Sequence, residues 1–201
     1  IIEPEPIFCE FDSECADANV CTNDKCLGNE QNNLSAAAID NIRGFAYFGA
    51  DMNPAEVVKV RLSDFTRVAT YVLPEATIGS MVIDPSAGFL YVTTGRNALV
   101  FPDPGKIYKI NLSTFELEDT LTLNLGEKDL RAAAIDTAAG FAYFGTNTNP
   151  GHIIKIRLSD LTRVAALTYT NIEKFFHTGV IDPQDPTDSS SGYLYFGTDD
   201  F

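Results

Sequence analysis

Residues 36–71 read AAAIDNIRGFAYFGADMNPAEVVKVRLSDFTRVATY, and residues 132–167 read AAAIDTAAGFAYFGTNTNPGHIIKIRLSDLTRVAAL. The two stretches agree at most positions, which marks them as copies of one unit. Residues 79–120 are a looser copy, and a fourth copy runs from Gly179 to Phe201. The aspartates of a recurring Ile-Asp pair lie between 44 and 52 residues apart, at Asp40, Asp84, Asp136 and Asp182. An array of similar structural units is therefore expected.

Each copy divides into four short segments with the composition of β-strands. The first is an apolar run that ends in Ile-Asp, such as residues 37–40, and a turn containing glycine follows it. The second is aromatic, as at residues 45–48, and such residues between glycine marks are typical of strands. Its tyrosine recurs in every copy, at Tyr47, Tyr91, Tyr143 and Tyr195.

The last two segments of each copy also have strand character. In residues 58–62 apolar and basic residues alternate, which places them on opposite faces of a strand. Residues 108–112 and 154–158 repeat this alternation. The fourth segment, at 67–73 and 163–169, begins with polar residues, which suits the outer edge of a sheet.

Four short strands in about 45 residues are the period of a β-propeller blade. The predicted fold class is all-β, with four-stranded antiparallel blades at 36–73, 79–123 and 132–169 and an incomplete blade at 179–201. Residues 1–33 are predicted to be a small cysteine-rich module with a linker, and residues 34–201 a partial propeller.

About three and a half blades fall short of the four to eight with which propellers close. Three explanations stay open: the sequence is part of a longer chain, a neighbouring subunit completes the ring or the blade, or the array is open and stacked. An unfinished blade would present unpaired N–H and C=O groups to another strand. Contacts of that kind that do not close a ring produce filaments.

All four cysteines lie within the first module, at Cys9, Cys15, Cys21 and Cys26. Residues 1–33 carry eight acidic residues and one basic residue, so covalent cross-links would replace a core there. Two disulfides are expected, and they imply an oxidising compartment. Of the three possible pairings, Cys9–Cys21 with Cys15–Cys26 is preferred, and the other two stay open.

Two metal sites compete with the disulfides in this module. Structural zinc prefers Cys-x2–4-Cys spacings, and only the last gap between cysteines has that length. Calcium could use the side-chain oxygens of Asp12, Glu14, Asp17 and Asn19, but the twelve-residue loop with its central glycine and terminal glutamate is absent. We expect no metal and no cofactor.

The charge and hydropathy of the chain exclude several classes of partner. Of the 201 residues, 28 are acidic and 14 are basic, so the net charge is −14, which repels nucleic-acid phosphates and anionic lipid. No apolar run approaches the ~18 residues that span a bilayer. The chain begins at Ile1 without a secretion signal, and we expect a processed chain or a fragment.

No catalytic constellation is recognisable, and we expect no enzyme activity and no catalytic residue. The two histidines, His152 and His177, lack a metal-ligand spacing, and His152 is expected in an exposed loop. The repeated Ile-Asp aspartates could form a ring of carboxylates for a cation. Because they recur in every copy, hydrogen bonding within their own turns is the favoured interpretation. A loop containing Asp182, Asp185 and Asp188 is the best asymmetric candidate for cation binding.

Two N-glycosylation sequons begin at Asn33 and Asn111. Both fit a secreted chain and predicted surface positions. Glycans at Asn33 and Asn111 are therefore expected.

Three stretches resemble known extracellular repeat proteins. VIDPSAGFLYVTTG, from Val82, and GKIYKINLSTFE, from Gly105, resemble YVTN-type β-propeller repeats of surface-layer and secreted proteins. The duplicated GFAYFGT and IIKIRLSDLTRV resemble large extracellular proteins of microbial eukaryotes, among them the subunits of tubular flagellar hairs (mastigonemes). DSECADANVCTNDKC, from Asp12, resembles a short EGF-like module.

These resemblances imply an extracellular, non-enzymatic structural protein that assembles with itself or with related subunits into a filament or surface appendage. The expected additional partners are attached glycans, and neither nucleic acid nor a membrane span is expected. The alternative is a secreted propeller that binds carbohydrate or protein as an adhesive or lectin-like protein.

Overall fold

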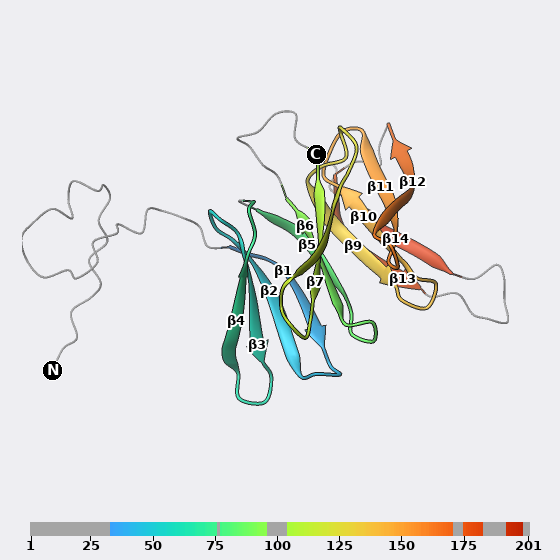
Figure 1. Ribbon diagram of the computed structural model, residues 1–201. Coiled ribbons are helices and arrows are strands. Elements are labelled where there is room, and N and C mark those ends of the chain that lie inside the picture. The colour runs from blue at the N-terminus through green and yellow to red at the C-terminus, as the bar shows by residue number, and fades with distance from the viewer. Residues whose placement is uncertain (1–32, 76, 96–103, 171–174, 183–191, 199–201) are drawn as a thin grey trace, which may run out of the picture. The chain divides into compact units, whose positions relative to one another are not determined.

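The computed structural model describes residues 33–75, 77–95, 104–170, 175–182 and 192–198 (Figure 1). The chain divides into two units, Ile1–Asn32 and Asn33–Phe201. The first unit lies outside the described residues, and with it the predicted cysteine module and its four cysteines. All of the described residues belong to the second unit.

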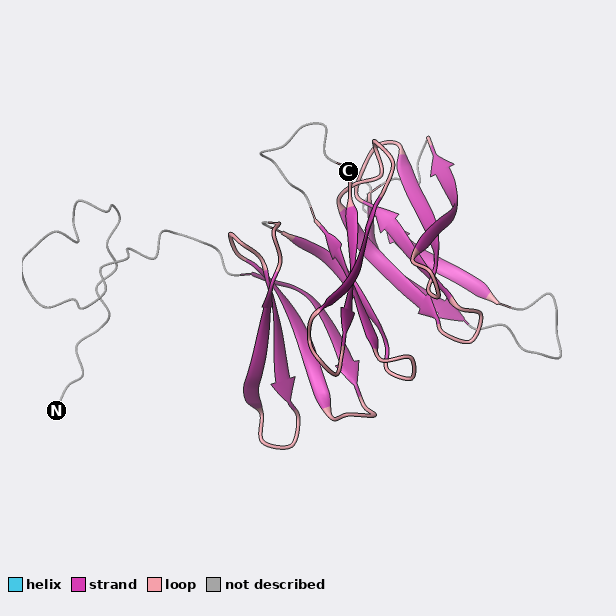
Figure 2. Ribbon diagram, viewed as in Figure 1, coloured by secondary structure: helices cyan, strands magenta, loops and turns pink. Residues whose placement is uncertain are grey.

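The described residues form β-strands joined by turns and loops, and they contain no helix (Figure 2). The strands are β1 (Asn33–Asp40), β2 (Phe45–Asp51), β3 (Glu56–Arg61), β4 (Thr66–Val72), β5 (Ile78–Asp84), β6 (Phe89–Thr94), β7 (Lys106–Asn111), β8 (Leu117–Thr122), β9 (Leu130–Asp136), β10 (Phe141–Thr146), β11 (Gly151–Arg157), β12 (Thr162–Tyr169), β13 (Phe176–Asp182) and β14 (Tyr193–Thr198). The predicted all-β class is confirmed.

The strands pair in chain order into separate antiparallel sheets. Blade 1 is β1–β4, blade 2 is β5–β8, and blade 3 is β9–β12, and each has four strands. Blade 4 contains two strands, β13 and β14, among the described residues. Figure 1 shows the sheets following one another in chain order, as the predicted propeller blades require.

The first strand of each blade begins earlier than the apolar pattern predicts. β1 begins at Asn33, whereas the pattern placed its start near residue 37. A bulge between Leu34 and Ala36 interrupts the pairing with β2, and bulges recur at the same place in the other three blades. A bulge breaks the alternation of side chains, so a pattern of period two does not extend across it.

Hydrophobic cores lie between successive blades. We call the side of a blade that looks toward the next blade in the chain its forward face, and the other side its rear face. Tyr47 and Val57 on the forward face of blade 1 pack with Leu90, Tyr108 and other residues of the rear face of blade 2. An equivalent core joins blade 2 to blade 3. Fully burying one such large apolar side chain stabilises the fold by about 1.5–3 kcal/mol.

The fourth strands are the exposed outer edges of the blades, as their polar residues predicted. The residues of β4 and β8 are exposed or half-buried. Strand β8 carries Glu118 and Asp119 on this edge, and charged side chains discourage pairing with other chains there.

Candidate functional site

A buried lysine connects blade 1 to blade 2. Lys59, in the middle of β3, is 9% exposed, and its Nζ donates a hydrogen bond of 3.0 Å to the carbonyl oxygen of Leu112 at the end of β7. The same Nζ lies 4.4 Å from the ring centre of Phe45 and 5.3 Å from that of Phe115. Burial lowers the pKa of Lys59, and the carboxylate of Asp40 partly opposes that shift. A carbonyl and two ring faces thus replace the water around this cation.

Blade 2 repeats this arrangement toward blade 3. Lys109 is 8% exposed and its Nζ donates to the carbonyl oxygen of Leu158 at 3.3 Å. The Nζ lies 4.1 Å from the ring centre of Phe89. We call this contact, a lysine on a third strand bound to the carbonyl after the next blade's third strand, the lysine clasp.

Blade 3 has the lysine of the clasp without its acceptor. Lys155 Nζ lies 3.8 Å from the ring centre of Phe141, as the other two lysines lie over Phe45 and Phe89. Within the described ranges no carbonyl or carboxylate accepts a hydrogen bond from it. The acceptor would belong to a third strand of blade 4, and the described part of that blade consists of β13 and β14.

Blade 1 also contains the turn that carries the acceptor carbonyl in blades 2 and 3. We call this turn, residues 62–65, 112–115 and 158–161 in the three blades, the acceptor corner. Leu62 N donates to the carbonyl of Gly44 at 3.0 Å, and the equivalent Leu112 and Leu158 make the same hydrogen bond at 2.9 and 3.0 Å. Three residues later each corner holds a side chain at positive φ, Phe65, Phe115 and Leu161, with φ of 54°, 58° and 49°. Blade 1 therefore presents the same corner as blades 2 and 3, but no described blade covers it.

Exposure separates the outer corner from the two inner ones. Phe115 packs between Tyr47 and Tyr71 of blade 1, with ring centres 5.9 and 6.4 Å apart, and is 9% exposed. Leu161 is 3% exposed, whereas Phe65 is 81% exposed. On the same rear face of blade 1, Ile39 and Leu62 are also exposed.

Among the described residues, the forward face of blade 4 is exposed as well. Val180, Tyr193 and Tyr195 are each more than half exposed. The two tyrosine rings lie 6.3 Å apart. By register, Tyr193 and Tyr195 occupy the places that Phe45 and Tyr47 hold in blade 1.

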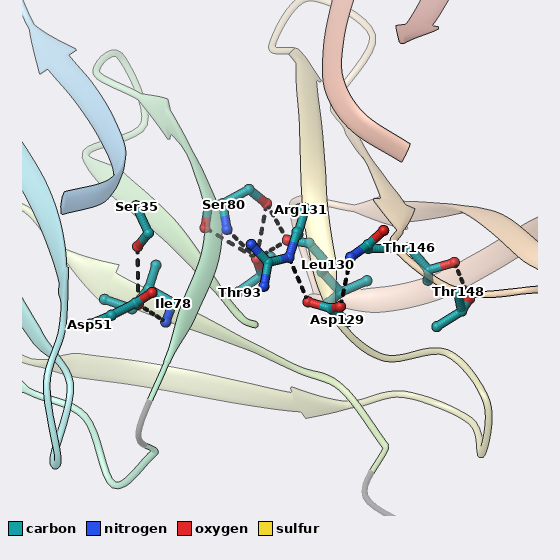
Figure 3. Close-up of polar contacts among 11 residues, drawn as sticks. Ser35, Asp51, Ile78, Ser80, Thr93, Asp129, Leu130, Arg131, Thr146 and Thr148 are labelled. Carbon is teal, nitrogen blue, oxygen red and sulfur yellow. Dashed lines mark hydrogen bonds and ion pairs between the residues drawn. The ribbon is translucent and has the colours of Figure 1, made fainter. Parts of the chain in front are cut away.

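A second set of polar contacts joins the blades near the starts of the inner strands (Figure 3). Ser80 Oγ donates to the carbonyl oxygen of Leu130 at 2.8 Å, and Thr93 Oγ1 donates to the same oxygen at 2.8 Å. The Asp51 carboxylate accepts hydrogen bonds from Ile78 N at 2.7 Å and from the hydroxyl of Ser35 at 3.1 Å, as Figure 3 shows. The contacts of Ser80 and Thr93 with Leu130 are buried and join blade 2 to blade 3, and the hydrogen bond from Ile78 to Asp51 joins blade 2 to blade 1.

Ion pairs secure the turn between blades 2 and 3. Arg163 donates to both oxygens of the buried Glu127 carboxylate, which raises the pKa of the arginine. Asp129 accepts from Arg131 Nε at 2.9 Å and from Asn147 Nδ2 at 3.0 Å. Each of these side chains has a partner within its own set, so both sets are structural supports.

The repeated aspartates hydrogen-bond within their own turns, as the sequence interpretation favoured. Asp40, which is fully buried, accepts hydrogen bonds from the backbone N–H groups of Ile42 and Arg43. Asp84 and Asp136 each accept one from the residue three positions on. Asp182 ends β13, and the remainder of its predicted loop, with Asp185 and Asp188, lies outside the described residues.

The histidines lie in strands. His152 belongs to β11 and is half-buried, so its predicted loop position is wrong; its Nδ1 lies 3.1 Å from the hydroxyl of Thr168. His177 lies near the start of β13. Among the described residues no cluster of three or more histidine, cysteine or acidic side chains could hold a metal ion.

Both predicted sequons fall within the described residues. Asn33 is exposed at the start of β1. Asn111 ends β7, where its Oδ1 accepts a hydrogen bond of 2.9 Å from Ser113 N. Glycosylation at Asn33 and Asn111 stays a prediction.

Comparison with solved structures supports the β-propeller fold. The chain is similar to the RRP9 WD40 repeats (10% identity, TM-score 0.59, covering 75% of this chain and 42% of that one). It is also similar to hydrazine synthase of Kuenenia stuttgartiensis (12%, 0.63, 75% and 41%) and to U3-55K (10%, 0.60, 84% and 53%). The chain thus spans about half of these structures or less. WD40 repeats form propeller blades, so this likeness shows the fold.

Other comparisons give no family for the chain. No protein-family description matches the sequence, and no curated protein is similar to it. Across the described ranges, no helix is long and apolar enough to cross a membrane.

Proposed function

We propose that this chain is a non-enzymatic structural protein outside the cell, a subunit of a filament or surface appendage. Further chain or a neighbouring subunit completes its repeat blades by protein–protein contact. The observation that carries the proposal is Lys155, placed like the lysines of both clasps but lacking a carbonyl acceptor among the described residues.

The edge of β14 is where the completing strand would bind. In blades 1–3 the second strand pairs on both sides, whereas β14 pairs with β13 alone among the described strands. An exposed edge accepts a strand by main-chain hydrogen bonds, and neighbouring pockets select its side chains. Here the clasp selects a strand whose last carbonyl can reach Lys155.

The extracellular location rests on the sequence. Cys9, Cys15, Cys21 and Cys26 fit disulfides, which persist in oxidising compartments, and the sequons fit secretion. The net charge of −14 gives neighbouring subunits a mutual repulsion that specific contacts must overcome.

A peptide with the sequence of β11–β12, residues 151–169, tests the proposal, because it is the third-and-fourth-strand hairpin of a complete blade. Binding of the labelled peptide to the 201-residue chain is measured by fluorescence anisotropy. We expect saturable binding and a higher melting temperature, and about tenfold weaker binding to a Lys155→Met chain. A scrambled peptide is the control.

Two results would count against this function. Equal binding of the scrambled and native peptides would exclude selection at the β14 edge. Absence of native-peptide binding would exclude completion by strand addition.

A second candidate function is carbohydrate binding, which the exposed pair Tyr193 and Tyr195 favours. Flat aromatic rings offer large apolar surfaces with little loss of conformational freedom. A glycan array tests this: carbohydrate binding requires a signal that Tyr195→Thr abolishes.

A further inference from the structure

We propose that two copies of this chain associate head to tail, with the forward face of blade 4 of one copy stacked on the rear face of blade 1 of the other. The inference rests on the proposed function, since it names the partner and the surfaces of the assembly. Two observations support it. The forward face of blade 4 and the rear face of blade 1 are both exposed, and a forward face packs on a rear face in both internal contacts, between blades 1 and 2 and between blades 2 and 3.

The rear faces show what the open surface of blade 1 is built to receive. In blade 2 this face is covered by the forward face of blade 1, and in blade 3 by that of blade 2. Leu112 and Leu158 are thereby 0% and 7% exposed, whereas the equivalent Leu62 is 41% exposed. The occupant that fits the rear face of blade 1 is therefore the forward face of a blade of this repeat.

In the described part of the chain, the forward face of blade 4 is exposed. Val180, Tyr193 and Tyr195 of blade 4 stand at the places of Ala38, Phe45 and Tyr47, which pack against the rear face of blade 2. All three side chains are more than half exposed. The forward face of blade 4 in a second copy can therefore cover the rear face of blade 1.

One aromatic contact identifies the register of the pair. Within the chain, Tyr47 meets Phe115 with ring centres 5.9 Å apart. Tyr195 is the equivalent of Tyr47, and Phe65 is the equivalent of Phe115 at the same positive φ. Stacking of blade 4 on blade 1 would bring Tyr195 of one copy against Phe65 of the next and bury both rings, as the Tyr47–Phe115 contact does within the chain.

The joint is heterologous, because it brings a forward face against a rear face. After the first contact one copy keeps a free rear face and the other keeps a free forward face, so association continues until a ring closes or a chain of copies forms. A pair of single variants can therefore be complementary, which a contact between identical faces would not allow.

The test uses the 201-residue chain and two single substitutions. Phe65→Asn removes the rear-face ring, and asparagine tolerates the left-handed backbone at that position. Tyr195→Thr removes the forward-face ring and keeps a residue that favours strands. Leu125→Ser is the matched control, because Leu125 is 72% exposed in the turn between β8 and β9, away from both faces. Circular dichroism establishes that each variant is folded.

Sedimentation velocity over a range of concentrations is the measurement. We expect the unsubstituted chain and Leu125→Ser to associate equally, and each single variant to associate about tenfold or more weakly. An equimolar mixture of Phe65→Asn and Tyr195→Thr should form a one-to-one pair. The first variant keeps an intact forward face on blade 4, and the second keeps an intact rear face on blade 1.

Three results would overturn the proposal: an unsubstituted chain that stays monomeric, single variants that associate as well as the control, or a mixture that forms no pair. None of these results alters the binding of the β11–β12 peptide at the β14 edge. That peptide can bind to a chain whose faces do not stack, so the two proposals fail separately.

Discussion

Burying a lysine among aromatic rings lowers the stability of the fold unless its ammonium group finds hydrogen-bond or cation–π partners there. Lys59 and Lys109 meet that requirement with a carbonyl of the next blade and the face of a phenylalanine. Removing the side chain therefore leaves a buried carbonyl without a donor, which costs more than a hydrogen bond at the surface.

Lys59→Met should lower the free energy of unfolding by about 1–3 kcal/mol, because Leu112 loses its buried donor. Urea denaturation measures the change. Lys155→Met is the matched control, since Lys155 donates to no acceptor among the described residues, and its loss should be clearly smaller. Equal losses for the two variants would show that the carbonyl contributes nothing.

Alkaline pH should weaken the fold through two buried tyrosines. Burial is the main cause that raises the pKa of Tyr47 and Tyr91 from 10.0 to about 12, and the nearby Asp40 and Asp84 carboxylates add to it. The folded state thus holds these protons more tightly than the unfolded state. Their contribution to stability is complete below about pH 10 and is lost as the pH rises toward 12.

Urea denaturation between about pH 9 and pH 11.5 measures this loss. The double variant Tyr47→Phe, Tyr91→Phe should show a shallower decline, because phenylalanine does not ionise. An unchanged slope in that variant would contradict the assignment. In the ultraviolet titration of the unsubstituted chain, these two phenols should ionise after the exposed ones.

At this scale the sequence predicts turn chemistry well and burial poorly. The role of Asp40 follows from its place before a turn, because a carboxylate hydrogen-bonds the backbone N–H groups two or three residues on. The burial of Lys59 does not follow from its strand alone, since alternation shows two faces but not which one meets solvent. The usable signal was the lysine recurring opposite a tyrosine, at Lys59, Lys109 and Lys155.

The elements are held together where backbones of neighbouring blades come close. Gly79, in β5, lies so near blade 3 that an added Cβ would stand 2.2 Å from the carbonyl oxygen of Leu130. That oxygen is the acceptor for Ser80 and Thr93. A small residue at this point lets three strands share one contact.

Gly79→Ala should therefore separate blades 2 and 3 and lower the free energy of unfolding by more than about 2 kcal/mol. Differential scanning calorimetry measures the fall in melting temperature. Gly49→Ala serves as the comparison, because its added Cβ would meet only the flexible side chains of Ile78 and Met81, at 3.0–3.1 Å. Similar costs at both positions would contradict the close approach at Leu130.

Element order and type could be predicted because each strand carries its own signal. The turns after Asp40, Asp84 and Asp136 and the aromatic second strands recur in every copy. Strand starts could not, because the bulges at β1, β5, β9 and β13 break the alternation. The contacts of Ser80 and Thr93 with Leu130 also escaped prediction, since they join residues about 37 to 50 positions apart.

For the whole molecule, charge and apolar surface oppose one another. The chain carries −14, and exposed apolar side chains such as Phe65 and Tyr195 lie on its open faces. Like charges repel over about 10 Å at moderate salt, and added salt screens that repulsion. Apolar contacts are not weakened by screening.

Self-association should therefore strengthen as sodium chloride rises from about 0.02 M to about 0.5 M. Sedimentation velocity at fixed protein concentration shows the change. An assembly held by ion pairs would instead dissociate with salt, and that result would contradict the apolar joint. The Phe65→Asn variant should show little change over the same range.

Each blade carries both the lysine that donates to the next blade and the corner that receives the previous blade, at Lys59 and Leu62 in the first copy. A gene duplication that adds a whole blade therefore adds one donor lysine and one acceptor corner together, and a deletion removes one of each. The number of blades can therefore change during evolution without requiring a new type of contact between blades. The near-identical sequences of residues 36–71 and 132–167 are consistent with such duplication.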